Sequence, residues 1–177
     1  DFFRKLSTIG HPSFNLTPDH SDTMKLETKC LHAGYQPDST TNSCAVPLYK
    51  TSSYVFNDTE HAANLFGLRE LGNIYTRLMN PTTDVLEQRV TALDGGAAAL
   101  GLASGTSGVF YSIINVAKEG DEIISANNLY GGTYTQFNDI LPKFGIEVKF
   151  VDPNDPANYA AAITDKTKAL FCETVSN

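Results

Sequence analysis

From residue 97 onward, short apolar runs alternate with amphipathic stretches of helical length. Short apolar runs bounded by turn-forming residues are typical of buried strands, whereas the longer stretches repeat apolar residues with the period of a helix. The pattern predicts strands at 97–103, 121–126, 146–152 and 168–174, and helices at 107–118, 132–144 and 155–164. Strands that alternate with helices form a mostly parallel sheet with right-handed crossovers. We therefore predict an α/β fold with helices on both faces of the sheet.

The first sixty residues carry weaker patterns. Residues 1–23 show neither the period of a strand nor that of a helix, and they are predicted to form an irregular, extended arm. Residues 24–59 are polar and rich in turn formers, except for 45–56 (AVPLYKTSSYVF), which alternates loosely. That stretch is predicted to be extended, and its pairing partner is left open.

Two helices are predicted between these residues and the regular α/β region. The first is capped by Asp58 or the threonine that follows it and ends at Gly72. Its apolar face is predicted to consist of Ala62, Leu65 and Phe66. The second is capped by Thr82 or Thr83, repeats leucine and valine at helical spacing, and is stopped by Gly95–Gly96.

Composition narrows the classes of function. The chain has 177 residues and a net charge of −7, so it lacks the clustered Lys and Arg that a nucleic-acid surface needs. The three cysteines are an odd number in no C-x-x-C spacing, which favours a reducing, cytoplasmic location. No apolar run approaches the roughly 20 residues that span a bilayer. Small metabolites are the expected partners; no metal site, nucleic acid or membrane contact is predicted.

A run of small residues, SGTSG at 104–108, separates the first predicted strand from the helix that follows it. This is the edge where open α/β sheets bind ligands, and free amides at a helix start attract anions. Gly105 lacks the Cβ that would keep an anion away, and Ser104, Thr106 and Ser107 add hydroxyl groups. A phosphate site is one interpretation, and a tight turn with a helix cap is the other. The run matches neither a P-loop nor a dinucleotide fingerprint.

Two further places carry candidate ligand-binding side chains. Tyr75 and Arg77 are two residues apart, so in an extended segment both side chains point the same way and could clamp a phosphate. Alternatively, they form an ordinary surface pair. Tyr130 follows the strand predicted at 121–126 and precedes Gly131 and Gly132, which leave its ring accessible for stacking on a planar heterocycle. Its alternative role is packing in a loop.

Several motifs together resemble a known family. In order and spacing, the chain is similar to the Cys/Met-metabolism family of pyridoxal-phosphate (PLP) enzymes from about residue 26 onward. The motifs are GNIYTRLMNPTTDVLEQRVTALDGG, ALGLASGTSG, NNLYGGTY, LPKFGIEVKFVD and FCETVSN. The resemblance implies the large domain of a fold-type-I PLP-dependent transferase, a mostly parallel sheet with helices on both faces, preceded by an extended N-terminal arm.

The resemblance also implies roles for individual residues. The amides of Gly105 and Thr106, beside Ser104, would hold the phosphate of pyridoxal 5′-phosphate. Tyr130 would stack on its pyridine ring and assist proton transfer as a catalytic residue. Thr106-Ser107-Gly108 departs from the family's usual turn, which has Gln or Met, then Ala or Ser, then Ala. Backbone donors survive that departure.

Four more positions are implied to lie near the cofactor. Tyr75 and Arg77 would reach the phosphate of the neighbouring subunit, because active sites in this family are shared across a dimer. Asn177 matches the asparagine that approaches the phenolic oxygen of the cofactor, and Glu173 is the acidic residue four positions before it. A homo-oligomer, expected to be a tetramer, follows from this sharing.

The implied activity is a γ-replacement in methionine and cysteine biosynthesis. O-acetylhomoserine and sulfide, or a thiol, would give homocysteine and acetate. The same scaffold also fits a cystathionine or methionine γ-lyase and a cystathionine γ-synthase. A third alternative is a catalytically incomplete fragment that contributes only phosphate-binding residues to a neighbour.

The resemblance places residues 1–80 in an N-terminal arm and subunit-contact segment and residues 81–177 in the first part of the PLP-binding large domain. The family's cofactor-binding lysine lies downstream of the E-T-x-x-N segment, so none of the lysines in the sequence is assigned to that role. Catalysis is therefore expected of the full-length protein, and the activity of residues 1–177 alone is left open.

Overall fold

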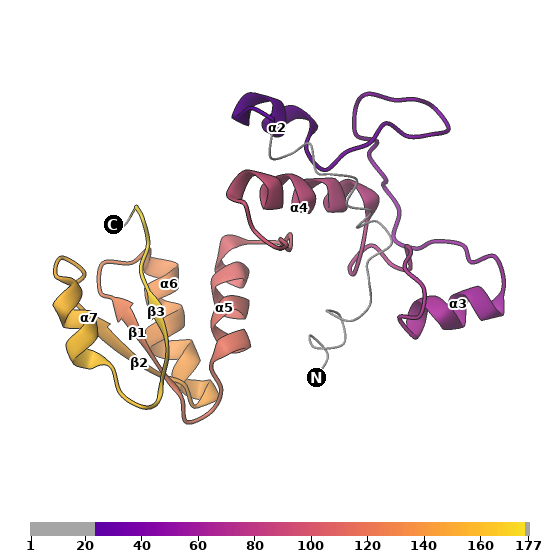
Figure 1. The fold of residues 1–177 in the computed structure, drawn as a ribbon. Coiled ribbons are helices and arrows are strands. Elements are labelled where there is room, and N and C mark those ends of the chain that lie inside the picture. Colours follow the sequence, from indigo (N-terminus) through magenta and orange to yellow (C-terminus); the bar gives the residue numbers. More distant parts are fainter. Residues whose placement is uncertain (1–23, 176–177) are drawn as a thin grey trace. The chain divides into compact units, whose positions relative to one another are not determined.

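A computed structural model describes residues 24–175 of the chain (Figure 1). The predicted arm at 1–23 and Asn177 lie outside the described residues. The chain divides into two compact units, Asp1–Gly101 and Leu102–Asn177. Within residues 24–175, no helix combines the length and the apolar character needed to cross a membrane.

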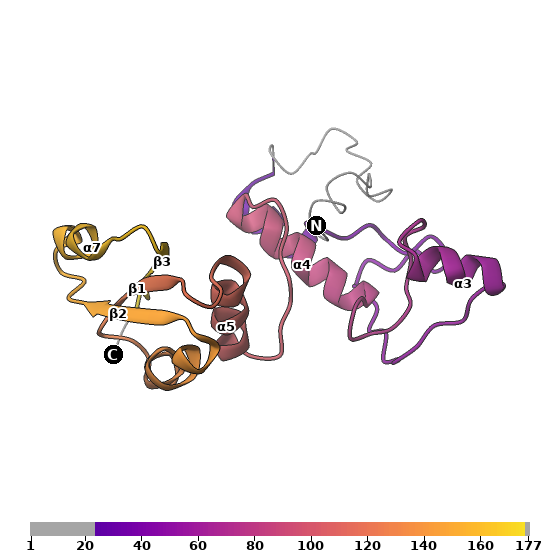
Figure 2. The same cartoon turned by 90° about the horizontal axis from the view of Figure 1, so that it is seen from below.

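The second unit is built around a parallel sheet of three strands in the order β2-β1-β3. Strand β1 (Glu122–Ala126) lies in the middle, between β2 (Glu147–Val151) and β3 (Thr167–Phe171). Every residue of β1 is buried. Strand β2 lies on one side of β1 and β3 lies on the other, so the chain moves across the sheet in one direction from β1 to β2 and in the opposite direction from β2 to β3. Because such crossovers are right-handed, the helices of the two connections cover opposite faces of the sheet. Figures 1 and 2 show this arrangement, with α7 on one face and α6 on the other. The predicted α/β fold is confirmed.

Three helices accompany this sheet. They are α5 (Gly105–Val116), α6 (Gly131–Thr135) and α7 (Pro156–Ala162). The helical segment that starts with α6 continues through a π turn, η2 (Gln136–Ile140), and a 3₁₀ turn, η3 (Leu141–Phe144). Pro142 explains the change of pitch, because a proline has no N–H to donate in a regular α-helix and its ring collides with the carbonyl one turn earlier. The buried core consists of Ile113, Ala117, Ile123, Ala126, Leu129, Phe137, Leu141 and Ile146.

One predicted strand is wrong. Residues 97–103 form no strand in the structure, and Leu100 is 72% exposed. A strand needs a hydrogen-bonded neighbour, and neither edge of the described sheet pairs with this segment. The apolar composition of this run indicated that it could be buried, but it did not indicate which strand it would pair with.

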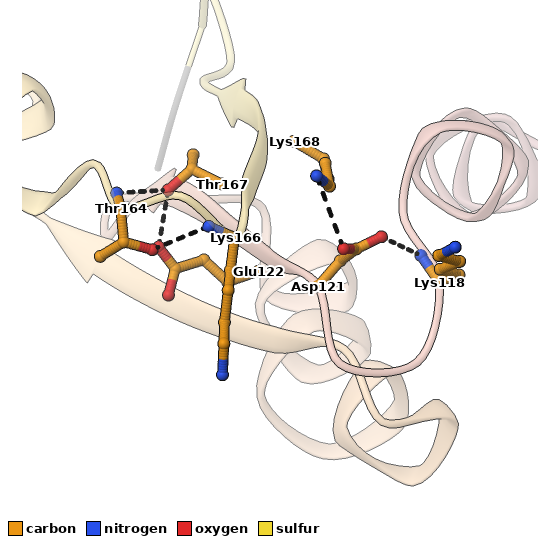
Figure 3. Close-up of polar contacts among 7 residues, drawn as sticks. All are labelled: Lys118, Asp121, Glu122, Thr164, Lys166, Thr167 and Lys168. Carbon is orange, nitrogen blue, oxygen red and sulfur yellow. Dashed lines mark hydrogen bonds and ion pairs between the residues drawn. The ribbon is translucent and has the colours of Figure 1, made fainter.

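The amino end of β1 carries a closed polar network, which we call the Glu122 network. Glu122 is 2% exposed, and its carboxylate lies 2.7 Å from the ammonium of Lys149 on β2. The hydroxyls of Thr164 and Thr167 both donate to its other oxygen at 2.6 Å (Figure 3). The hydrogen bond from Lys149, followed by those from the two threonines, lowers the pKa of Glu122 to about 2. The carboxylate is therefore ionised and fully partnered.

Asp121, the neighbouring residue, extends this closed arrangement. Its carboxylate accepts a hydrogen bond from the backbone N–H of Lys118 at 3.0 Å and lies 3.7 Å from the ammonium of Lys168 (Figure 3). The carboxylates of Asp121 and Glu122 are thus both bound by groups of the chain itself.

The first unit is formed by three short helices and long connecting segments. They are α2 (Leu26–His32), α3 (Thr59–Phe66) and α4 (Pro81–Asp94). Helix α4 packs against α2: the Nε of Arg89 donates to the carbonyl of Ala33 at 2.9 Å, and Gly34 sits directly against α4. This packing places α4 in the first unit, whereas the boundary predicted at residue 80 assigned it to the second region. The boundary predicted at residue 80 divides a segment that contacts another subunit from the domain that binds the cofactor. That functional division stays a prediction.

For α2 and α3, the structure corrects the sequence predictions at three points. Helix α2 was not predicted. Helix α3 has the predicted Asp58 cap, with Oδ1 accepting from the N–H of His61 at 2.7 Å, but it ends at Gly67 rather than Gly72. Phe66 was placed on the apolar face with Leu65; Leu65 is buried, whereas Phe66 is 66% exposed.

Helix α4 is capped by Asn80, with Pro81 in its first turn, rather than by Thr82 or Thr83. An asparagine followed by proline suits the start of a helix. The asparagine side chain accepts a hydrogen bond from a free backbone N–H of the first turn, and proline has no N–H that would be left without a partner. The predicted stop is confirmed: Gly95 adopts a left-handed conformation with φ of 64°.

Candidate functional site

The first turn of α5 presents free hydrogen-bond donors at the carboxyl edge of the second unit. Ser104 caps the helix: its Oγ accepts from the N–H of Ser107 at 3.1 Å and shares a hydrogen bond of 2.9 Å with the hydroxyl of Ser107. Among the described residues, nothing accepts from the amides of Gly105 and Thr106 or from the hydroxyl of Thr106. A methyl group at Gly105 would have no neighbouring heavy atom within 4 Å, so the space beside these donors is open.

The two interpretations of the small-residue run thus apply to different residues. Ser104 caps the helix, whereas the donors of Gly105 and Thr106 have no acceptor among the residues that the structure describes. Two unpaired amides at the start of a twelve-residue helix favour an anion such as a phosphate.

Tyr130 stands at the start of α6 and reaches the same edge of the sheet from β1. Tyr130 is 59% exposed, and its ring lies over Gly132, where a Cβ would come within 2.5 Å of the ring's Cε1. At Gly131, by contrast, a Cβ would meet nothing within 4 Å. The second glycine of the pair is therefore the one that lets the ring lie close to the backbone.

Glu173 holds the start of α6 from the neighbouring strand. One carboxylate oxygen accepts from the backbone N–H of Tyr130 at 2.7 Å, and the other accepts from the hydroxyl of Thr133 at 2.8 Å. Glu173 is half-buried. The structure therefore brings Tyr130 and Glu173 together, as two residues predicted to serve one site.

Gln136 connects the helix that starts with α6 to the first turn of α5. Its side chain is 8% exposed, and its Nε2 donates to the carbonyl of Thr106 at 3.3 Å. Its Oε1 is buried and has no partner among the described residues. Nothing in the sequence distinguishes this residue, because its neighbours Thr135 and Asn138 are polar as well.

Tyr75 and Arg77 lie in the first unit, where they line a shallow groove of about 510 Å³. The backbone there is a turn that follows a bridge between Ser53 and Tyr75, rather than the extended segment that was predicted. The guanidinium of Arg77 sits 5.7 Å from the centre of the Tyr75 ring. Lys50 and Tyr49 line the same groove, so two cations and two tyrosines share it.

Asn80 holds the two walls of this groove together. Its amide nitrogen donates to the carbonyl of Tyr49 at 2.9 Å and to the hydroxyl of Thr76 at 3.2 Å, while its oxygen caps α4 through the N–H of Thr82. Asn80 is 5% exposed. Its role was missed because the contacts with Tyr49 span more than thirty residues of sequence.

The predicted site residues thus fall into two groups, each within one unit. Ser104, Gly105, Thr106, Tyr130 and Glu173 lie at the carboxyl edge of the sheet in the second unit, whereas Tyr75 and Arg77 share the groove of the first. The cofactor roles of all these residues stay predictions.

Comparison with known proteins agrees with this geometry. The family model described as "Cys/Met metabolism PLP-dependent enzyme" matches residues 27–177. An O-acetyl-L-homoserine sulfhydrylase of Leptospira meyeri is 58% identical over 153 residues, which cover 86% of this chain and 35% of the relative. A homocysteine synthase of Schizosaccharomyces pombe is 52% identical, covering 85% of this chain and 35% of the relative.

A solved structure has a similar backbone. A putative O-acetylhomoserine (thiol)-lyase from Campylobacter jejuni, solved with N′-pyridoxyl-lysine-5′-monophosphate, matches with a TM-score of 0.81 at 43% identity. The match covers 87% of this chain and 38% of that one. The chain therefore spans little more than a third of the length of the relatives that it matches.

Proposed function

The chain belongs to the Cys/Met metabolism family of PLP-dependent enzymes, and from this premise we propose that the carboxyl edge of the second unit binds pyridoxal 5′-phosphate. The observation that carries the proposal is the open first turn of α5. The amides of Gly105 and Thr106 have no acceptor among residues 24–175, and a Cβ at residue 105 would have no heavy atom within 4 Å. A doubly charged phosphate ester suits such a turn, because both the donors and the helix dipole favour negative charge.

Within this arrangement the residues of the chain bind and orient. The amides of Gly105 and Thr106, with the Thr106 hydroxyl, hold the phosphate; Ser104 maintains the helix start that presents them. Tyr130 offers an exposed ring for stacking on the pyridine. When bound, the cofactor supplies an electron sink for carbanion chemistry at the substrate amino acid. With the cofactor bound, the phenolic oxygen of Tyr130 would be the group of this side chain that holds a proton.

We propose that the intact protein is a sulfhydrylase that converts O-acetylhomoserine and sulfide into homocysteine and acetate. Relatives at 52–58% identity carry the names O-acetyl-L-homoserine sulfhydrylase and homocysteine synthase, which supports this choice over a lyase or a cystathionine synthase. The cytoplasmic location and the tetrameric state predicted from the sequence stay predictions.

The activity is tested on the intact protein supplied with pyridoxal 5′-phosphate. Formation of homocysteine and acetate from O-acetylhomoserine is measured with and without sulfide, beside release of keto acid from methionine and from cystathionine. Sulfide-dependent homocysteine formation is the expected result. Release of keto acid without homocysteine formation would contradict the proposal and support a γ-lyase.

We further propose that the groove of Tyr75 and Arg77 completes the phosphate site of a neighbouring subunit. The support is chemical: the groove contains two cations, Lys50 and Arg77, and no carboxylate among its lining residues. Hybrid oligomers of two impaired variants, Tyr130→Ala and Arg77→Ala, test the sharing. If sites are shared, one site of each mixed pair has both native residues and activity is recovered; if they are not, every site lacks one residue and mixing restores nothing.

A further inference from the structure

Glu173 and Tyr130 come from adjacent parallel strands and meet at one edge of the sheet. Tyr130 follows β1 and Glu173 follows β3, and these strands are hydrogen-bonded neighbours. We propose that Glu173 is a positioning residue, which fixes the start of α6 so that the Tyr130 ring is presented at the phosphate-binding edge. This inference rests on the proposed cofactor site and deepens it.

The carboxylate of Glu173 replaces a cap that α6 lacks. No side chain of the helix itself caps its start, where Tyr130 occupies the capping position. Glu173 instead accepts from the N–H of Tyr130 and from the hydroxyl of Thr133, at 2.7 and 2.8 Å. A negative carboxylate at this end of a helix is also favoured by the helix dipole. Glu173, which follows β3, therefore binds both ends of the first turn of α6.

The ring of Tyr130 is restrained from a second side by Gly132. Because a Cβ at residue 132 would lie 2.5 Å from the ring, the ring occupies the volume that any other residue would fill. The backbone is held by Glu173 and the ring rests on the glycine, while 59% of the side chain stays exposed. A ring restrained before binding loses less conformational entropy when it stacks on a ligand.

This role differs from the direct cofactor contact that the family resemblance implied for Glu173. Both of its oxygens already accept hydrogen bonds from the chain, and these bonds direct the carboxylate to the N–H of Tyr130 and the hydroxyl of Thr133. A carboxylate in direct contact with a phosphate would also repel it. Glu173 therefore acts on the cofactor through Tyr130.

The test is a double-mutant cycle on the intact protein freed of cofactor. The dissociation constant of pyridoxal 5′-phosphate is measured for wild type, Glu173→Ala, Tyr130→Ala and the double variant, together with the visible circular dichroism of the bound cofactor. Thermal unfolding of each protein checks that it is folded. Glu147→Ala is the matched control, because Glu147 is exposed on β2 and its side chain makes no hydrogen bond or ion pair among residues 24–175.

We expect Glu173→Ala to weaken binding about tenfold and to reduce the dichroic band, since loss of an aligned aromatic stack is of this order. In the Tyr130→Ala background the same change should weaken binding less than about twofold. Glu173→Gln should restore binding to within about threefold of wild type, because its amide oxygen can accept from Tyr130 and its NH₂ group can donate to Thr133.

An equal loss in both backgrounds would overturn the inference, since Glu173 would then act independently of Tyr130. Unchanged binding in Glu173→Ala would overturn it as well, while leaving the cofactor site in place. Failure of the wild-type protein to bind pyridoxal 5′-phosphate would be a separate result: it would overturn the proposed function, and the inference with it.

Discussion

The two ends of β1 use polar groups in opposite ways. At the amino end, Glu122 is buried and its carboxylate is enclosed by Lys149, Thr164 and Thr167. At the carboxyl edge, the amides of Gly105 and Thr106 have no partner among the described residues and face open space. A closed network contributes to stability and leaves nothing for a ligand, whereas unpaired donors contribute little to stability and are available for binding. The comparison predicts that substitutions at the two ends separate stability from cofactor affinity.

The largest expected effect is a loss of stability at the closed end. Glu122→Ala leaves the ammonium of Lys149 and two threonine hydroxyls without their acceptor beside a fully buried strand. We expect the unfolding temperature of the intact protein to fall by about 5 °C or more, because breaking a buried pair is among the most costly substitutions. Calorimetry measures this change.

Glu147→Ala is the control for this substitution, because Glu147 pairs with Glu122 in the strand register but is exposed. Its unfolding temperature should stay close to that of wild type. Equal stability of the Glu122→Ala and Glu147→Ala proteins would show that the Glu122 network does not stabilise the sheet.

At the open end, Gly105→Ala should reduce cofactor affinity and leave stability almost unchanged. The added methyl group has no neighbour within 4 Å in the protein, but it enters the space where the phosphate approaches the amides. Loss of one charge-assisted hydrogen bond should raise the dissociation constant of the cofactor about tenfold to hundredfold. Titration of the cofactor-free protein with pyridoxal 5′-phosphate gives the value.

The matched variant is Gly108→Ala, one turn further along α5, where a Cβ would meet only Leu102 at 3.9 Å. It should bind the cofactor like wild type. Similar losses in both variants would mean that α5 is sensitive to any added side chain, and not that its first turn binds the phosphate.

A smaller effect on cofactor affinity is expected at Gly132, on which the ring of Tyr130 packs. Gly132→Ala must displace the Tyr130 ring, whereas Gly131→Ala has room for its methyl group. We expect binding of pyridoxal 5′-phosphate to weaken by about threefold to tenfold in the first variant and to stay unchanged in the second. The same titration measures both, and a reversed order would refute the seating of the ring on Gly132.

The smallest effect at neutral pH concerns the ionisation of Glu122. Its pKa is lowered from 4.5 to about 2, chiefly by the hydrogen bond from Lys149. The folded state then binds this proton less readily than the unfolded state. The stabilisation is therefore fully present above pH 4.5 and is lost as the pH falls from about 4.5 toward 2. Glu122→Gln should lack this component when its unfolding temperature is compared with that of wild type across the same range; parallel curves would contradict the lowered pKa.

Much of the second unit could be predicted from sequence because its strands are short apolar runs between turn formers. The runs around β1, β2 and β3 gave each strand to within a few residues. The segment 97–103 has the same composition but no strand partner among the described residues, and composition does not encode pairing. Helix α2 was missed because none of its seven residues is buried, so it lacks an apolar face to detect.

The candidate site was predictable in part for a similar reason. Tyr130 follows β1, so sheet topology alone places it at the ligand-binding edge. Gly105 was assigned to that edge because it follows the apolar run 97–103, which forms no strand in the structure. The contact between Tyr130 and Glu173 spans 43 residues and depends on β1 and β3 being neighbours, which the order of elements did not specify. Asn80 and Gln136 act through long-range hydrogen bonds, and single-sequence patterns contain no signal for such partners.

The most direct test is a crystal structure of the intact protein with pyridoxal 5′-phosphate. Our account predicts phosphate oxygens within hydrogen-bond distance of the amides of Gly105 and Thr106, and the pyridine ring stacked on Tyr130. A phosphate bound elsewhere, with the first turn of α5 covered by side chains of the protein itself, would contradict it.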